Sequence, residues 1–465
     1  MPPTSLIHID LSAVHDNMRV LRRVVGQGCA LCAILKADGY GLGARPLAVT
    51  LARAGADLLA VYTLQQAEEL ARESLTIPIM VLMPVADFEP TEALEALLAA
   101  GRLHLTVHAP EQMVSLADLA ARLGLVLPVH LEVDTGMSRG GCTIDEAPAI
   151  VHRITDPLMA RRLHLAGLFT HFADTKAANP VYMNRQAARF EAVVDQVKDV
   201  LPRDCLIHTA NSVATLRAKR FHKSMVRVGQ AWAGYGVDSL DEGEFLRLGR
   251  QLRPVVSWTS RIVHVKTIEP GTPVGYRCTW TAKRRSRIGL VPVGHADGYP
   301  TGLGTTDTKP GLACVGVVVD ERSTSTNARH YVPVIGVVNM DQITIDLTDI
   351  DPPDRGASGR VHVGTEVELI SADAGAPNHL PALATAAGIV PHALLAGLSS
   401  HLQRVYHADR PTTHKPASAA SPINIELSAI IEATEISMSR AIMTRAMGSA
   451  MMAFSEKLKV ESARL

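Results

Sequence analysis

The sequence predicts an α/β protein: an eight-stranded parallel (β/α)8 barrel followed by a mostly-β C-terminal domain and a helical C-terminal tail. Two observations predict the barrel. Residues 12–245 alternate short apolar runs with longer amphipathic segments, and the apolar runs number eight. After about residue 250 the runs become β-rich and are separated by Gly, Pro, Asp and Asn, which predicts the second domain. A chain of 465 residues is long enough for both.

The expected barrel strands are short and apolar, as parallel strands covered on both faces are. They are Ala30–Leu35, Asp57–Val61, Ile77–Leu82, Leu103–Val107, Leu127–Val133, His164–Thr170, Cys205–Thr209 and Ser224–Val228. The segments between them place apolar residues at helical spacing, as in Ala44–Ala54, Leu64–Glu73 and Asn184–Val200. An open doubly wound sheet is the alternative for this alternation. No G-x-G-x-x-G follows an early strand to favour it.

The β-rich part begins with a long run and continues in shorter ones. The runs are Val255–Val265, Arg287–Val293, Ala313–Val319, Tyr331–Val338, Gln342–Leu347 and Glu366–Leu369. The opening strand Leu6–Leu11 can join this sheet. We therefore expect a barrel over 12–245, a β domain over 1–11 and 246–408, a Pro-, Ser- and Thr-rich linker over 409–423, and a helical tail of unknown role over 424–465.

Composition excludes several functional classes. With 46 Lys and Arg against 46 Asp and Glu, the chain lacks the basic excess of a nucleic-acid binder, and it offers no charge for a membrane surface. Six cysteines are too few for a disulfide scaffold, and Cys29 and Cys32 are interpreted as structural rather than redox or metal residues. No metal site is expected. No apolar run reaches ~18 residues and no secretory signal is visible, so we expect a cytoplasmic enzyme.

Lys36 is the first candidate for chemistry because it closes the first apolar strand. Barrel active sites form at the carboxyl ends of the strands. Desolvation there lowers a lysine pKa, and a neutral amine can form a Schiff base. Gly39, Gly41 and Gly43 follow, and glycines permit close approach of backbone to a ligand. The alternative is a surface lysine in a glycine-rich loop.

The segment Ile34-Leu35-Lys36-Ala37-Asp38-Gly39-Tyr40-Gly41 closely resembles the pyridoxal-phosphate lysine motif of bacterial alanine racemases. Seven further motifs follow in the order of that family: Val133–Arg139, Thr170–Ala173, Ala210–Ser212, Val226–Gly229, Val274–Tyr276, Ala296–Tyr299 and Asn339–Gln342. The resemblance covers about residues 5–407. It implies a pyridoxal 5'-phosphate enzyme that interconverts L- and D-alanine for peptidoglycan. It also implies a head-to-tail homodimer with shared active sites.

The resemblance gives Lys36 and Tyr276 the catalytic roles. Lys36 would hold the cofactor and act as one base, and Tyr276 from the β domain would be the other. Two bases on opposite faces of Cα satisfy the geometry of racemisation. Arg227 would face the pyridine nitrogen, oriented by His171. Without their motifs, Tyr276 would be a half-buried strand tyrosine, Arg227 a surface ion-pair residue and His171 a satisfied core histidine.

A phosphate site is expected at the last two barrel strands. Asn211 and Ser212 follow the seventh strand, and Gly229 and Gln230 follow the eighth, which are the loops where barrels commonly bind phosphate. Serine hydroxyl and backbone N–H groups suit a dianion. Tyr40 would add its hydroxyl. Ser212 alone would be an ordinary helix N-cap.

Substrate contacts are implied for three residues. Arg139 would approach both the phenolic oxygen of the cofactor and the substrate carboxylate, which guanidinium geometry suits. Met340 and the backbone of Asp341 would contact the substrate from the β domain. The alternative for Met340 is a buried strand methionine.

Three positions depart from the family pattern. Glu132 lies where many members carry a lysine whose carbamate supports the arginine, and a carboxylate can supply the same negative charge. His295 and Ser400 replace two tyrosines near the phosphate and the substrate access. These changes bear on specificity, so a broad-specificity or serine racemase is the alternative. A non-catalytic pyridoxal-phosphate-binding protein has the barrel and lysine without a β domain, which argues against it here.

Overall fold

The computed structural model describes residues 3–176, 180–305, 313–321, 326–354 and 359–408. Within these ranges the chain forms two nine-stranded sheets and a two-stranded one. The linker and helical tail predicted for 409–465 lie outside the described residues.

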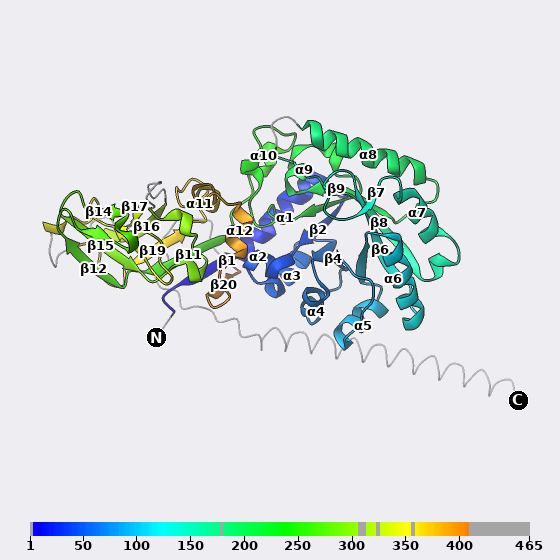
Figure 1. Cartoon of the computed structure of the whole chain (residues 1–465), viewed down its shortest axis with the longest axis horizontal. Coiled ribbons are helices and arrows are strands. Elements are labelled where there is room, and N and C mark those ends of the chain that lie inside the picture. Colours follow the sequence, from blue (N-terminus) through cyan, green and yellow to red (C-terminus); the bar gives the residue numbers. More distant parts are fainter. Residues whose placement is uncertain (1–2, 177–179, 306–312, 322–325, 355–358, 409–465) are drawn as a thin grey trace, which may run out of the picture. The chain divides into compact units, whose positions relative to one another are not determined.

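The first sheet closes into the predicted parallel barrel (Figure 1). Its eight strands are β2 (Ala30–Ile34), β3 (Leu58–Val61), β4 (Ile79–Pro84), β5 (Leu103–Val107), β6 (Leu127–Asp134), β8 (Leu163–Phe169), β9 (Leu206–Asn211) and β10 (Met225–Val228). Parallel pairings run from β2 to β10 in chain order, and β10 pairs with β2 to close the ring. The two-residue strand β7 (Cys142–Thr143), too short for a periodic pattern, is added beside β6.

Helices cover the outside of the barrel and connect its strands (Figure 1). The covering helices are α1 (Leu11–Val25), α3 (Ala44–Arg53), α4 (Leu64–Ala71), α5 (Glu92–Ala99), α6 (Pro110–Leu123), α7 (Ala147–Thr155), α8 (Val181–Val197), α9 (Ser212–Arg217) and α10 (Leu246–Gly249). The short element α2 (Lys36–Gly41) is instead a turn of left-handed backbone that follows β2. Local chemistry sets several helix starts. Thr63 and Gln66 form a capping box before α4, and Asp10 accepts a hydrogen bond from Ala13 N–H before α1.

Alternation along the barrel strands separates two layers of side chains. One set of alternate positions is apolar on most of the strands and packs in the main core with the helices. The other set differs between two halves. Cys32, Ile34, Leu58, Ala60, Met80 and Met225 form a separate buried cluster, here called the apolar half. On β5, β6 and β9 the corresponding positions hold His104, His130 and His208, here called the imidazole half.

The second sheet is the predicted β domain. Its strands, in spatial order, are β12 (His264–Ile268), β15 (Ser286–Val291), β18 (Ile343–Asp346), β17 (Thr326–Ile335), β16 (Cys314–Glu321), β19 (Glu366–Ile370), β11 (Val256–Arg261), β1 (Leu6–Asp10) and β20 (Gln403–His407). The opening strand pairs antiparallel with β11. The short strands β13 (Pro273–Val274) and β14 (Trp280–Thr281) pair with each other. Helices α11 (Leu380–Ala387) and α12 (Pro391–Ala396) precede β20.

The single run expected over Val255–Val265 is two strands. The chain changes partners at its middle: Ile262 N–H donates to the Thr365 carbonyl, and Val263 N–H donates to the Leu290 carbonyl. β11 therefore lies inside the sheet and β12 at its edge. An uninterrupted β-rich run cannot reveal such a switch of neighbours.

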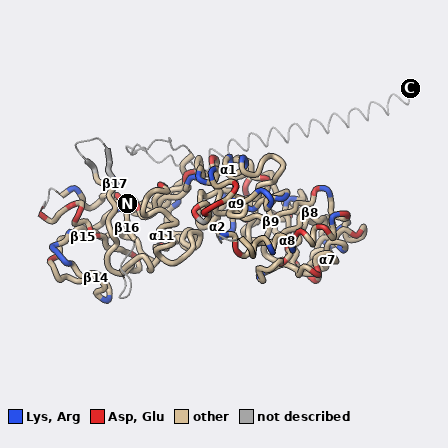
Figure 2. The backbone as a smooth tube through the Cα atoms, turned by 90° about the horizontal axis from the view of Figure 1, so that it is seen from above, with Lys and Arg blue, Asp and Glu red and all other residues tan. Residues whose placement is uncertain are grey.

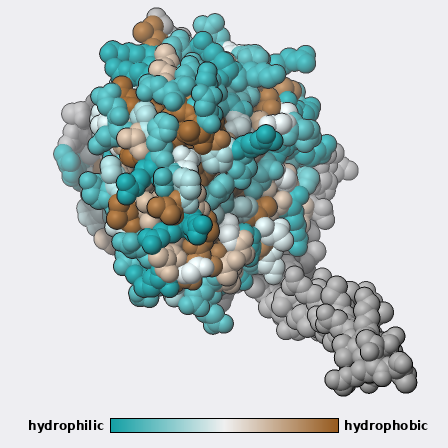
Figure 3. All heavy atoms as spheres, turned by 90° about the vertical axis from the view of Figure 1, so that its right-hand side faces the viewer, coloured by the Kyte–Doolittle hydropathy of each residue, from teal (hydrophilic) through white to brown (hydrophobic). Residues whose placement is uncertain are grey.

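Positively and negatively charged residues are both distributed along the backbone of the barrel and of the β domain (Figure 2), in keeping with the balanced composition. Hydrophilic side chains cover most of the face seen in Figure 3, with hydrophobic ones between them. Among the described helices, none combines the length and the apolar character needed to cross a membrane.

Candidate active site

Lys36 lies two residues beyond the carboxyl end of β2 and opens a turn of unusual backbone. Ala37, Asp38, Gly39 and Tyr40 have φ of 54°, 52°, 63° and 60°. This left-handed region costs roughly 1–2 kcal/mol for each residue that has a side chain. From the sequence alone, a left-handed backbone is expected only at Gly39.

Neighbouring groups hold this turn in place. Gly39 N–H donates to the Leu35 carbonyl at 2.8 Å, and the Asp38 carboxylate accepts from Ala44 N–H at 2.7 Å, at the start of α3. A Cβ on Gly41 would lie 2.5 Å from the Leu395 carbonyl oxygen, so glycine is required where α12 packs on the turn. The turn and the lysine are therefore fixed by the surrounding fold.

Three basic side chains at the mouth of the barrel interact electrostatically with one another or with His171. They are Lys36, Arg139 and Arg227. Burial, and then the charge of Arg139, lower the pKa of the Lys36 ammonium. Burial, and then the charges of Arg227, Arg139 and Lys36, hold the pKa of His171 well below its usual range. A less basic amine beside a neutral imidazole is a suitable environment for a lysine that acts as nucleophile or base.

Arg227 lies inside the barrel with 4% of its surface exposed. Its Nη2 donates to the Thr170 carbonyl at 2.9 Å and to His171 Nδ1 at 3.2 Å, and its Nη1 donates to His208 Nδ1 at 2.8 Å. Burial lowers its pKa to about 10, and the charge of Glu132 opposes that shift. The guanidinium therefore stays charged at neutral pH, in a cage of neutral acceptors.

The loops after β9 and β10 are joined by Ser212. Its Oγ accepts from Gly229 N–H at 2.9 Å and from Ala231 N–H at 3.2 Å, which leaves its own proton to donate. Asn211 caps α9 by accepting from Val213 and Ala214 N–H, both at 3.1 Å. The predicted phosphate loops therefore meet.

Tyr40 reaches these loops from the lysine turn. A Cβ on Gly229 would lie 2.1 Å from the Tyr40 hydroxyl oxygen, so only glycine allows this approach. Burial raises the pKa of Tyr40, which keeps the hydroxyl a hydrogen-bond donor.

His392 is a residue at this mouth that the sequence did not indicate. It lies on α12, and its Nδ1 is 2.6 Å from Gln230 Nε2. Burial, and then the charges of Lys176 and Lys36, lower its pKa. No motif marks it, and only the packing of α12 on the lysine turn brings it here.

The predicted β-domain residues are not gathered with the barrel residues. Tyr276, at the start of the 3-10 helix Tyr276–Cys278, is 74% exposed, and Met340 is 59% exposed. Asp341 is exposed beside it. Met340 is thus not the buried strand methionine of the alternative. Its carbonyl accepts from Ala296 N–H at 3.0 Å, which fixes the backbone of its loop.

The positions that depart from the family pattern are placed as follows. Glu132 is 8% exposed, and its Oε2 lies 3.6 Å from His108 Nδ1. That nitrogen accepts from Gly141 N–H at 2.8 Å, so it has no proton to offer the carboxylate. Ser400 and His295 are exposed.

Thiol chemistry is not favoured at Cys29 and Cys32. Both are free and buried, and burial raises their pKa to about 11 and about 12. Thiolate, the reactive form, is therefore suppressed, as the structural interpretation requires.

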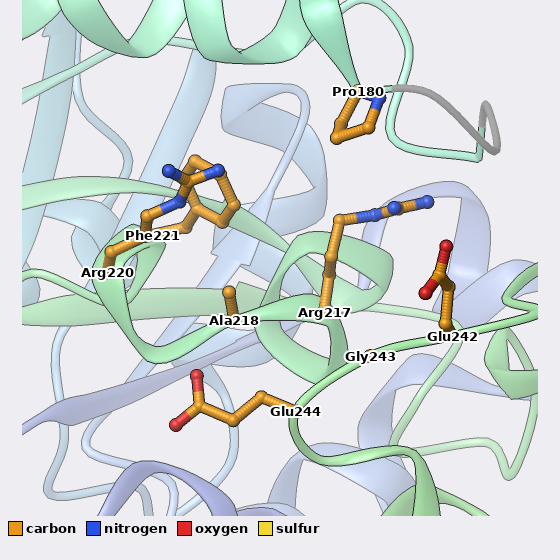
Figure 4. Close-up of a pocket in the computed structure, with 8 residues that line it drawn as sticks. All are labelled: Pro180, Arg217, Ala218, Arg220, Phe221, Glu242, Gly243 and Glu244. Carbon is orange, nitrogen blue, oxygen red and sulfur yellow. The ribbon is translucent and has the colours of Figure 1, made fainter.

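A cavity of about 500 Å³ lies elsewhere on the barrel, between Pro180 at the start of α8 and the segment that ends in Glu244 (Figure 4). Arg217, Arg220 and Glu242 also line it. None of the predicted site residues does, so this cavity is separate from the lysine.

The fold and the site together define a barrel enzyme that has a lysine amine at the mouth of the barrel. A β domain follows the barrel along the chain. The family models for the N-terminal and C-terminal domains of alanine racemase match residues 9–237 and 255–406. The chain therefore belongs to the alanine racemase family, whose enzymes use pyridoxal phosphate.

Individual relatives agree with this assignment. An alanine racemase of Halothermothrix orenii is 33% identical over 86% of this chain and 95% of its own length. The alanine racemase structure from Streptomyces coelicolor A3(2) has 29% identity and a TM-score of 0.71, over 87% of this chain and 98% of its own. The structure from Bartonella henselae, described with covalently bound pyridoxal phosphate, has 26% identity and a TM-score of 0.69, over 87% and 100% of the two chains.

Proposed function

We propose that the chain is an alanine racemase that interconverts L- and D-alanine with pyridoxal phosphate on Lys36, and that it supplies D-alanine for peptidoglycan. The observation that carries this proposal is the lysine of lowered pKa at the barrel mouth, together with Arg139 and the buried Arg227. Membership of the alanine racemase family supports it. We further propose a cytoplasmic location, and the barrel and β-domain limits 12–245 and 1–11 with 246–408.

The residues present fit the cofactor. Ser212 Oγ already accepts two N–H groups, so its hydroxyl proton and the tip of Tyr40 are donors for a phosphate. Asn211, Gly229 and Gln230 complete that loop pair. Arg227 would face the pyridine nitrogen, and a permanently charged guanidinium there opposes protonation of the ring. A weaker electron sink limits side reactions such as transamination.

When bound, pyridoxal phosphate acidifies the Cα proton of an amino acid. Lys36 Nζ, as a neutral amine, would take or return that proton on one face, and the Tyr276 hydroxyl would do so on the opposite face. Arg139 would hold the substrate carboxylate, with Met340 and the Asp341 backbone closing the site.

The exposure of Tyr276 and Met340 supports a head-to-tail homodimer. In that arrangement the β domain of one subunit would present these residues to the barrel of the other. The barrel of the partner would then cover these side chains, which are 74% and 59% exposed in the single chain.

A broad-specificity or serine racemase is the second candidate, favoured by Ser400 and His295 at positions where the family pattern has tyrosines. A non-catalytic pyridoxal-phosphate-binding protein is disfavoured, because such a protein has no need of the β domain that carries Tyr276.

The first experiment is a racemisation assay with L-alanine, L-serine and L-lysine, run beside Lys36→Ala. We expect alanine to be the best substrate and Lys36→Ala to abolish turnover. After borohydride reduction, peptide mass spectrometry should find the pyridoxyl group on the wild-type peptide that contains Lys36. A Lys36→Ala variant that keeps full activity would refute the proposal.

A further inference from the structure

Three histidines of the imidazole half form a continuous line through the barrel to Arg227. His104 Nδ1 lies 2.9 Å from His130 Nε2, His130 Nδ1 lies 3.0 Å from His208 Nε2, and His208 Nδ1 lies 2.8 Å from Arg227 Nη1. His130 and His208 are completely buried. His104, the second residue of β5, is partly exposed at the amino-terminal end of the strand, opposite the mouth that holds Lys36.

The chemistry of Arg227 gives this line a direction. A guanidinium can only donate, so His208 Nδ1 must accept, and a neutral His208 then carries its proton on Nε2. The same rule repeats at each step: His208 Nε2–H donates to His130, and His130 Nε2–H donates to His104. All three rings are therefore the same tautomer. The dipole of each points its acceptor nitrogen toward the guanidinium.

Neutral rings are what this site needs. Burial, and then charges that include Arg227, hold the pKa of His130 and His208 well below the usual range. Among the residues that the structure describes, no carboxylate is hydrogen-bonded to Arg227, and the charge of Glu132 acts on it from a distance. A buried cation without a bonded anion depends on the acceptors around it.

We propose that His104, His130 and His208 form a one-way hydrogen-bond chain that holds Arg227 from the far end of the barrel. His104 is then a positioning residue for the active site, although three hydrogen bonds separate it from the guanidinium. The effect of His104 on racemisation rests on the proposed function. The existence of the hydrogen-bond chain does not rest on it.

The direct test is ¹⁵N NMR of histidine-labelled protein, which distinguishes the two neutral tautomers. The wild-type enzyme should show His104, His130 and His208 as neutral rings protonated on Nε2. A ring of this trio that is protonated on Nδ1 overturns the proposal, and this measurement needs no variant that must fold.

Two substitutions then test the position of His104. His104→Asn places an amide oxygen close to the position of Nδ1 and should preserve the tautomer of His130. His104→Leu removes the acceptor, so the His130 and His208 signals should shift or split into two tautomers. Identical His208 signals in the wild type and the leucine variant would overturn the role of His104.

The kinetic arm separates this inference from the proposed function. His104→Leu should lower kcat for alanine roughly tenfold with little change in KM, and His104→Asn should retain most of the rate. A wild type without racemase activity but with the expected NMR signals refutes the proposed function alone. An active wild type whose leucine variant keeps its tautomers and its kcat refutes the inference alone.

Discussion

The barrel mouth and the β domain supply the predicted site in opposite ways. In the barrel, Arg227 is 4% exposed and hydrogen-bonded to carbonyl and imidazole groups, and Lys36 opens a turn that is held by its neighbours. In the β domain, Tyr276 is 74% exposed and Met340 is 59% exposed. The barrel residues are thus held by contacts within their own chain. The β-domain residues instead face outward, as the proposed dimer requires.

The β-domain loops are nevertheless well defined. A Cβ on Gly294 would lie 2.1 Å from the Met340 carbonyl oxygen, and the same carbonyl accepts from Ala296 N–H. Asp297 accepts from Gly294 N–H at 2.8 Å and lies 2.8 Å from His401 Nε2. The backbone is thus preorganised while the side chains stay free to meet another surface.

The largest effect is expected from Tyr276→Phe. Loss of one of two bases should reduce racemisation by about 10²–10⁴-fold, while titration of apoenzyme with pyridoxal phosphate stays unchanged. Tyr331→Phe, which alters another exposed tyrosine of the same domain, is the matched control and should keep its activity. Collapse of cofactor binding in Tyr276→Phe, or a rate loss below about tenfold, would argue for a structural role.

Mixing two inactive variants tests whether the two groups belong to different chains. Lys36→Ala and Tyr276→Phe, unfolded and refolded together in equal amounts, should recover about a quarter of the wild-type rate. Half of the dimers are then mixed, and each has one intact site. Each variant refolded alone is the control. No recovery, with mixed dimers demonstrated by mass spectrometry, would place Lys36 and Tyr276 of one site in the same chain.

The buried imidazoles should make the barrel acid-sensitive. Burial, and then the charge of His164, lower the pKa of His104 to about 4. An unfolded histidine takes up its proton near pH 6.5, so the unfolded state binds more protons between about pH 6.5 and 4. Stability that is fully present above pH 6.5 is therefore lost as the pH falls through this window, by about 3 kcal/mol for this group.

Urea denaturation between pH 7.5 and 4.5 measures this effect, with His104→Leu as the variant that lacks the titrating group. The variant should lose less stability on acidification than the wild type does. Hydrogen exchange should show the added opening in barrel strands such as β5 and β6 rather than in the β domain. If the free energy of unfolding fell equally in the two proteins between pH 7.5 and 4.5, the lowered pKa of His104 would be contradicted.

The barrel could be predicted because strands that are buried on both faces have continuous apolar sequences, such as Ala30–Leu35. Lys36, Arg227 and Ser212 were found because each sits in a motif at a strand end. Their positions relative to one another follow from barrel closure, which brings consecutive strand ends to one mouth.

Other features depend on contacts that no local pattern records. His130 and His208 lie on different strands, and they meet only because each faces the interior of a closed ring. The left-handed turn at Ala37 is held by its neighbours in space. His392 reaches Gln230 only through the packing of α12. Site residues at strand ends could therefore be predicted from the sequence, whereas contacts between side chains across the barrel interior could not.

The smallest effect is expected at Ser400, which concerns how tightly the β-domain side of the site is closed. Serine in place of a tyrosine leaves space for a side chain larger than methyl, so serine should be measurably turned over beside the better substrate alanine. An added methylene changes discrimination by only ~1–3 kcal/mol, so Ser400→Tyr should sharpen the alanine preference rather than create it. The measurement is kcat/KM for alanine and serine in both proteins, with Ser400→Ala as the control that keeps the space. Because Ser400 is exposed in the single chain, an unchanged ratio would mean that it does not line the substrate access. A neighbouring side chain that fills the vacated space would leave the ratio equally unchanged, and a crystal structure of Ser400→Tyr would distinguish the two cases.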